Sequence, residues 1–176
     1  MSRVVLSIGS NLGDRVARLQ SVVDALGERI RAVSPVYETD PWGGVDQGPF
    51  LNAVLIADDP AFDGHGWLQF SQNLEQLAER VRGQKWGPRS LDVDLVTVRD
   101  GQDNTVELFS RDEGLTLPHP LAHLRAFVLI PWLDVDPDAE LTVAGEMRPV
   151  ARLLDELDPA DRDSVRLTGL VLEPAH

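Results

Sequence analysis

One apolar stripe constrains the fold of this chain more than any other feature. Between residues 62 and 82, large apolar side chains recur at spacings of 3, 4, 3 and 4: Trp67, Phe70, Leu74, Leu77 and Val81. That spacing places them on one face of an α-helix. The runs 50–57 before the stripe and 91–98 after it are rich in apolar and β-branched residues, which is typical of strands. The segment therefore predicts a strand, a helix that buries one face, and a second strand.

The N-terminal third predicts the same order of elements. Residues 3–8 form a β-rich run, Asp14 can cap a helix over the following dozen residues, and Gly27 is placed to end it. Residues 33–38 are expected to form the next strand. The resulting βαββαβ order predicts the α+β class: a ferredoxin-like antiparallel sheet with helices packed mainly on one face. Extra C-terminal elements are a hairpin over 105–117, helices over 121–133 and 149–157, and a strand over 165–172.

The whole chain sets limits on its partners and location. A length of 176 residues favours a single domain over 1–176, which we expect to be a monomer. The absence of cysteine excludes disulfides. No apolar run approaches the ~20 residues of a membrane helix, so we expect a cytoplasmic protein that has no membrane partner. A formal net charge of −13 argues against nucleic acid, although a local basic cluster could still hold a small anionic substrate.

The residues that indicate a chemical function lie mainly between positions 80 and 94. Asp92 and Asp94 stand two apart on a predicted strand, which puts both carboxylates on one face. Such a pair needs a cation or hydrogen-bond donors between its like charges, and carboxylate oxygens suit Mg²⁺ with substrate phosphates. A bare Asp-x-Asp is more often a solvated strand face. Here, however, four basic residues and no acidic ones lie between positions 80 and 89, as a metal–polyphosphate site requires: Arg80, Arg82, Lys85 and Arg89.

These residues also carry a resemblance. Residues 86–94, with the sequence WGPRSLDVD, resemble the signature of the 6-hydroxymethyl-7,8-dihydropterin pyrophosphokinase family of folate-pathway enzymes. Three further segments resemble the family in the same order: residues 8–14, residues 37–43 with 50–53, and residues 117–120 with 125–127. The resemblance runs from about residue 4 to residue 137, and the tail 143–176 matches weakly.

The resemblance implies a role for each matched residue. Asp92 and Asp94 would ligate two Mg²⁺ ions that accompany ATP, and together with Arg82 and Arg89 they would form the catalytic set. The residues at the pterin would be Thr39, Trp42, Phe50, Asn52, Trp86 and Phe127. The residues at the ATP would be Arg82, Lys85, Arg89, Leu95, Thr116, His119 and Arg125. Taken alone, Phe50 and Phe127 would more often be core residues. In the family reading they sandwich the flat ring, and Asn52 hydrogen-bonds its edge.

The implied reaction is attack of a pterin hydroxymethyl oxygen on the β-phosphorus of ATP, which releases AMP. Two alternatives stay open. One is an ordinary small-molecule kinase that yields ADP. The other is an inactive pterin- or nucleotide-binding module, because Lys85 stands where the family pattern has Arg and the loop between Arg82 and Lys85 is one residue short.

Overall fold

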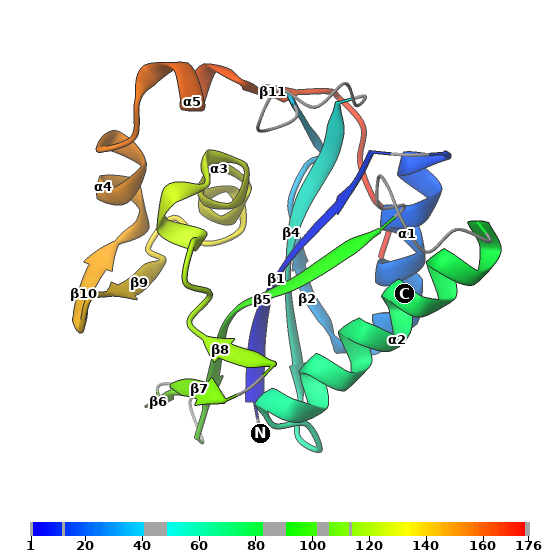
Figure 1. Ribbon diagram of the computed structural model, residues 1–176, viewed down its shortest axis with the longest axis horizontal. Helices are drawn as coiled ribbons and strands as arrows, with labels where there is room; N and C mark the ends of the chain where they lie inside the picture. Colours follow the sequence, from blue (N-terminus) through cyan, green and yellow to red (C-terminus); the bar gives the residue numbers. More distant parts are fainter. Residues whose placement is uncertain are drawn as a thin grey trace.

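In the computed structural model, an antiparallel sheet runs through the middle of the fold (Figure 1). The structure describes residues 2–11, 13–40, 49–82, 91–101, 106–112 and 114–174, except for the side chains of residues 79–82. The strands of the sheet are β1 (Ser2–Ser10), β2 (Ile30–Val33), β3 (Tyr37–Thr39), β4 (Phe50–Asp59), β5 (Asp92–Asp100), β6 (Val106–Glu107) and β11 (Val165–Leu167). Their order is β11-β3-β4-β1-β5-β6, and β2 also pairs with β4.

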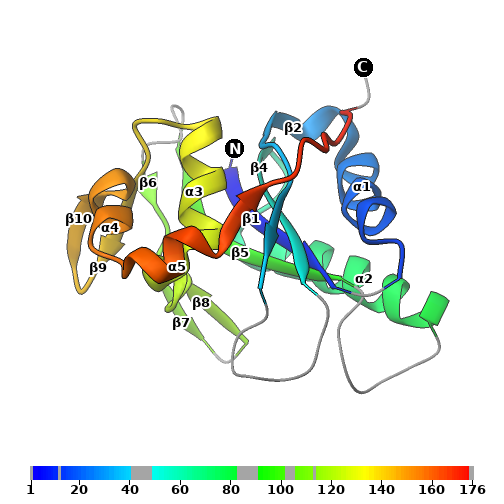
Figure 2. The same ribbon diagram turned by 90° about the horizontal axis from the view of Figure 1, so that it is seen from above.

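Helices cover both faces of this sheet (Figure 1 and Figure 2). They are α1 (Arg15–Leu26), α2 (Gly64–Arg82), α3 (Ala126–Val135), α4 (Val150–Asp155) and α5 (Pro159–Asp163). On one face, Leu19 of α1 and Trp67 of α2 belong to a single buried cluster. On the other, Trp132 of α3 and Leu153 of α4 belong to a second cluster. The expectation that the helices pack mainly on one face is therefore wrong.

The central strands explain the second layer. Val4 and Leu6 of β1 face the cluster of α1 and α2, whereas Val5 between them faces α3. In β4, Leu55 and Ile56 divide between the two clusters in the same way. A strand buried on both faces is apolar at nearly every position, so its sequence does not reveal that a second layer covers it.

The boundaries of α1 confirm their sequence signals. The Asp14 side chain accepts a hydrogen bond from the backbone N of Ala17 at 3.1 Å, and Gly27 follows the helix with a φ of 56°. The stripe on α2 is confirmed at Trp67, which is fully buried, and wrong at Leu77, whose side chain stays 55% exposed. None of the described helices combines the length and the apolar character that crossing a bilayer requires.

The remaining elements depart from the sequence expectations in detail. The strand expected over 33–38 divides into β2 and β3 around Pro35, because proline cannot donate to a ladder. Within the hairpin expected over 105–117, strand β7 (Ser110–Asp112) pairs with β8 (Leu115–Leu117). The helix expected over 121–133 begins as a 3₁₀ turn (Ala122–Leu124) ahead of α3. A hairpin of β9 (Glu140–Val143) and β10 (Glu146–Pro149) was not expected.

Candidate active site

The candidate site forms where β5 becomes an outer strand. On its inner side, Asp92 and Asp94 stand opposite Gly9 and Ser7 of β1. Among the described residues, β6 pairs with β5 only at the far end, at Arg99 and Asp100. Near the aspartates the outer edge of β5 therefore meets side chains and a loop. The side chain of Glu75 on α2 accepts a hydrogen bond from Val93 N at 3.0 Å, and the carbonyl of Val96 accepts one from His119 N at 2.9 Å.

A cavity of about 640 Å³ wraps around this edge. Its walls come from β1, β3, β4, β5, α2 and β8, and from the segment that leads into α3. Ten of the residues expected at the site from the sequence line it: Thr39, Phe50, Asn52, Asp92, Asp94, Leu95, Thr116, His119, Arg125 and Phe127. Trp42, Lys85, Trp86 and Arg89 lie outside the described residues, and Arg82 ends α2 with a side chain that is not described.

One half of the cavity has an ordered amide in its wall. Asn52 donates from Nδ2 to Thr39 Oγ1 at 2.7 Å, and both residues are buried. Gly9 faces Asn52 across the β1–β4 pairing, and a Cβ at position 9 would lie 2.9 Å from Asn52 Oδ1. Glycine therefore lets the amide occupy its position. Phe50 and Phe127 line the same cavity from β4 and α3, so an amide and two aromatic side chains share one space.

The other half is charged. The Asp94 carboxylate is 43% exposed and lies 3.7 Å from Nη1 of Arg125. The Arg125 guanidinium in turn sits 5.6 Å from the ring centre of Phe127. Arg125 thus lies between the Asp94 carboxylate and the aromatic half of the cavity.

His119 stands beside this pair with an altered acidity. Burial lowers the pKa of His119; the negative charge of Asp94 opposes that shift, and the charge of Arg125 adds to it. The net shift is downward, which favours the neutral ring. Leu121 N donates to Nδ1 at 3.1 Å, so the neutral ring carries its proton on Nε2 and can donate from there.

The carboxylate pair fits a hard cation that arrives with its substrate. Among the described residues, no group of three or more His, Asp or Glu side chains could hold a metal ion, so these residues alone form no complete protein cage. Asp92 and Asp94 alternate along β5, share a face and line the cavity. One or two carboxylates beside space for phosphates is the donor set that Mg²⁺ usually takes, so the residues present fit this ion.

The wall that α2 contributes to the cavity was not predicted from the sequence. Leu68, Ser71, Gln72 and Glu75 all line the cavity. Their spacing of 3, 1 and 3 places them on one helical face next to the apolar stripe. That second stripe, mostly polar, was the available signal.

A carboxylate pair beside a cavity lined by aromatic and amide side chains offers the groups that a metal-dependent phosphotransfer enzyme needs for a flat substrate: metal ligands and faces for stacking. A family model described as 7,8-dihydro-6-hydroxymethylpterin-pyrophosphokinase (HPPK) matches residues 5–137. The chain therefore belongs to the HPPK family, as its sequence resemblance predicted.

Two relatives that share one enzyme name match nearly the whole chain. The 2-amino-4-hydroxy-6-hydroxymethyldihydropteridine pyrophosphokinase of Mycobacterium tuberculosis is 66% identical over 169 residues, which cover 95% of this chain and 90% of that protein. The enzyme of the same name from Mycobacterium leprae is 61% identical over 176 residues, covering 98% of this chain and 92% of the relative.

Solved structures share the fold at low sequence identity. A crystal structure of Plasmodium falciparum HPPK-DHPS superposes with a TM-score of 0.63 at 13% identity, covering 88% of this chain. The chain spans 45% of that longer protein. The match supports a fold of mixed helices and antiparallel sheet.

Proposed function

We propose that the cavity at β5 transfers pyrophosphate from ATP to 6-hydroxymethyl-7,8-dihydropterin, giving AMP and the pterin diphosphate for folate biosynthesis. The single observation that carries this proposal is the course of the cavity. It runs from an amide and two aromatic rings, past the carboxylates of β5, to the outer edge of that strand. The two substrates can thus bind on either side of the metal site. The HPPK family and its named relatives favour this activity over an ordinary kinase or an inactive module.

The pterin belongs in the half of the cavity built on β3 and β4. Because Asn52 Nδ2 is engaged by Thr39, the amide is held in one orientation and Oδ1 is left to accept from the ring edge. Phe50 and Phe127 supply aromatic faces for stacking. We assign Trp42 and Trp86 to the same substrate from the family pattern.

The nucleotide belongs at the outer edge of β5. There the backbone of Leu95, the side chain of Thr116 and Nε2 of His119 offer hydrogen-bonding groups to the base and ribose. Arg125 lies close enough to Asp94 to bind phosphate oxygens beside the metal. Arg82, Lys85 and Arg89 are proposed to contact the phosphates, with Arg82 and Arg89 acting in catalysis.

Asp92 and Asp94 would hold two Mg²⁺ ions, which neutralise phosphate charge and stabilise the transferring group. The reaction forms a bond between the pterin hydroxymethyl oxygen and the β-phosphorus of ATP. It breaks the bond from that phosphorus to the oxygen that bridges to the α-phosphorus, so AMP leaves. No covalent intermediate on the protein is needed, since phosphoryl transfer depends mainly on positioning and charge stabilisation.

Three expectations about the whole chain belong to the same proposal. The order β5-β1-β4-β2, with helices following β1 and β4, supports a ferredoxin-like βαββαβ core. The pairing of β11 with β3 supports one domain over residues 1–176 that includes the tail 143–176. A cytoplasmic monomer that binds neither nucleic acid nor membrane remains our prediction.

A product assay tests the proposed function. The protein is mixed with ATP, Mg²⁺ and 6-hydroxymethyl-7,8-dihydropterin, and the nucleotides are separated. AMP that appears in step with the pterin diphosphate is expected. ADP would instead mean attack at the γ-phosphorus, as in an ordinary kinase. Nucleotide binding without either product would favour the binding module.

A further inference from the structure

The C-terminal strand reaches the pterin half of the cavity. β11 pairs with β3, so that Arg166 stands opposite Glu38, and Val165 stands opposite Thr39. β3 is a three-residue strand held between β4 and β11. In Figure 2, the red strand between α5 and the C-terminus is β11, which lies at the edge of the sheet next to β3. Part of the tail that sequence resemblance left without a role thus supports the strand that carries Thr39.

Both terminal nitrogens of the Arg166 guanidinium bind carboxylates at the end of β3. Nη2 lies 3.0 Å from Asp40 Oδ1 and 3.1 Å from Glu38 Oε1, and Nη1 lies 3.3 Å from Asp40 Oδ2. This is a two-pronged contact with Asp40, of the kind that fixes direction as well as distance. The hydrogen bonds and charge of Arg166 hold the pKa of Asp40 below its ordinary value, so Asp40 stays ionised. Asp40 itself lines the cavity, next to Thr39.

A second arginine contacts Glu38, one of the two carboxylates that Arg166 binds. Arg15 of α1 lies 3.8 Å from Glu38 Oε2 and donates to the carbonyl of Pro49 at 2.9 Å. Pro49 immediately precedes Phe50, the aromatic residue at the start of β4. Glu38 therefore lies between two guanidinium groups, one at the end of β3 and the other at the beginning of β4.

We propose that Arg166 is a positioning residue for the pterin half of the cavity, acting through Asp40 and Glu38 to hold the end of β3. The inference rests on the proposed function. Thr39 must present its hydroxyl to Asn52 for the amide to face the pterin, and β3 is too short to fix its own end. Without Arg166, Asp40 and Glu38 lose these contacts, and the end of β3 that carries Thr39 loses its anchor to β11.

The expected effect is selective. Arg166 is 46% exposed, and exposed ion pairs contribute little to stability, so Arg166→Gln should leave the melting temperature nearly unchanged. The KM for the pterin should rise by roughly three- to tenfold, while the KM for ATP stays within about twofold of wild type. Arg166→Lys should recover part of the loss, because a lysine keeps the charge but cannot make the two-pronged contact.

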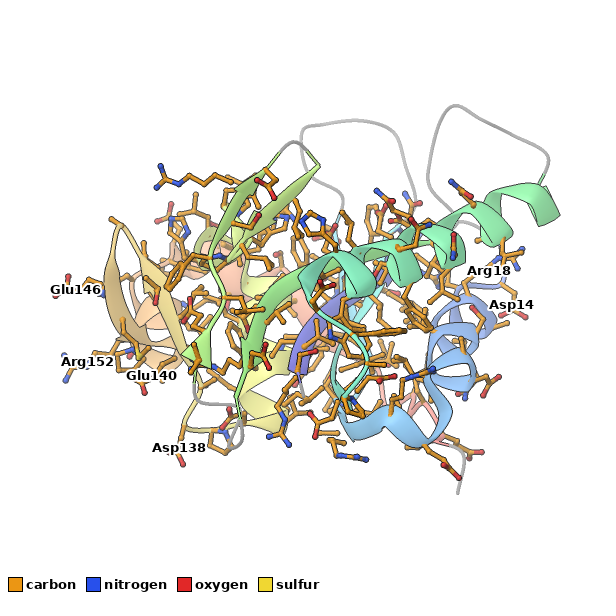
Figure 3. The ribbon with its side chains drawn as sticks, turned by 90° about the horizontal axis from the view of Figure 1, so that it is seen from below. Asp14, Arg18, Asp138, Glu140, Glu146 and Arg152 are labelled. Atoms are coloured by element: carbon orange, nitrogen blue, oxygen red, sulfur yellow. The ribbon has the colours of Figure 1, made fainter. Side chains whose placement is uncertain are left out.

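The experiment measures both KM values and kcat for wild type, Arg166→Gln, Arg166→Lys, Asp40→Asn and the double variant Arg166→Gln/Asp40→Asn. If Arg166 acts through Asp40, the two substitutions should not add. The rise in the pterin KM of the double variant should then be smaller than the two single effects combined, and close to the rise in either single variant. Arg148→Gln is the control, since Arg148 also forms an ion pair with a carboxylate, that of Glu156, and is also partly exposed. Arg148 lies on β10, and Figure 3 shows Glu146 of β10 and Arg152 of α4 at the end of the molecule away from Asp14 and Arg18.

Three results would separate the possibilities. A pterin KM within twofold of wild type in Arg166→Gln overturns the positioning role. A joint rise of both KM values with a lower melting temperature also overturns it, because β11 would then act only as structural support. A wild-type protein that makes no AMP refutes the proposed function instead. In that case the positioning role is tested by pterin binding alone, followed through the fluorescence of the pterin, and equal affinities in wild type and Arg166→Gln overturn it.

Discussion

Replacement of Gly9 by alanine should damage pterin binding through one contact. The new Cβ would lie 2.9 Å from Asn52 Oδ1, whereas ordinary van der Waals contact begins near 3.4 Å, so the amide oxygen must retreat by about half an ångström. Asn52 is 4% exposed and is held by its 2.7 Å hydrogen bond to Thr39, so it cannot retreat without stretching that bond. Overpacking of this size typically costs ~1–3 kcal/mol, and a hydrogen bond contributes ~1 kcal/mol.

The assay separates stability from binding. Gly9→Ala should lower the free energy of unfolding by about 1–3 kcal/mol and raise the pterin KM by roughly tenfold or more, since the displaced amide is the group that faces the ring. The ATP KM should change much less. Gly66→Ala is the control, because its Cβ would meet only side-chain atoms, at 3.4 Å. A Gly9→Ala protein with an unchanged pterin KM would show that Asn52 does not contact the substrate as we infer.

Three further measurements test the charges of the chain. Asp94→Asn should reduce kcat by roughly a hundredfold or more without loss of the fold, and removal of Mg²⁺ from wild type by a chelator should have the same effect until Mg²⁺ is restored. Tyr37 is the chain's one tyrosine, so phenolate absorbance reports it alone; burial and its hydrogen-bonded carboxylate raise its pKa to about 12, and the midpoint should fall to about 10 on unfolding. Because the pKa of Tyr37 is higher in the folded state than in the unfolded state, the neutral phenol stabilises the fold. This contribution is complete below pH 10 and is lost as the pH rises towards 12. Burial alone would raise the pKa of Asp58, but hydrogen bonds from Arg3 and Arg31 outweigh it and lower the pKa below 3.8. The ionised carboxylate therefore stabilises the folded wild type, and this contribution should be lost as the pH falls below about 4. In urea titrations across that range, the free energy of unfolding of Asp58→Asn should fall less than that of wild type.

Local signals predicted the elements that frame the site. Asp14 and Gly27 marked the ends of α1, and the alternation of Asp92 with Val93 marked β5 with both carboxylates on one face. These features depend on neighbours within a few residues, where spacing and side-chain chemistry decide the structure. The family signature then extended the prediction to residues such as His119 that the chain brings to β5 from a distance.

Contacts between distant segments escaped the sequence analysis. Trp132 belongs to a helix whose burial was foreseeable, but not the face of the sheet that it covers. Glu75 was assigned to a helix without recognition that its carboxylate reaches the edge of β5. Arg166 lies 126 positions from Asp40 and was expected only as part of a last strand. In each case the partner is fixed by strand order and packing, which the pattern of a single segment does not contain.

The two halves of the site depend on different kinds of support, and this has a consequence for variation. Asp92 and Asp94 lie on a nine-residue strand paired with β1 along most of its length, so the metal position is set by the centre of the sheet. Thr39 lies on a three-residue strand whose outer neighbour is β11. A change in the last dozen residues should therefore alter the pterin half while leaving the carboxylates in place. The C-terminal segment, rather than the sheet centre, is where substrate affinity can be adjusted with the least effect on the metal site.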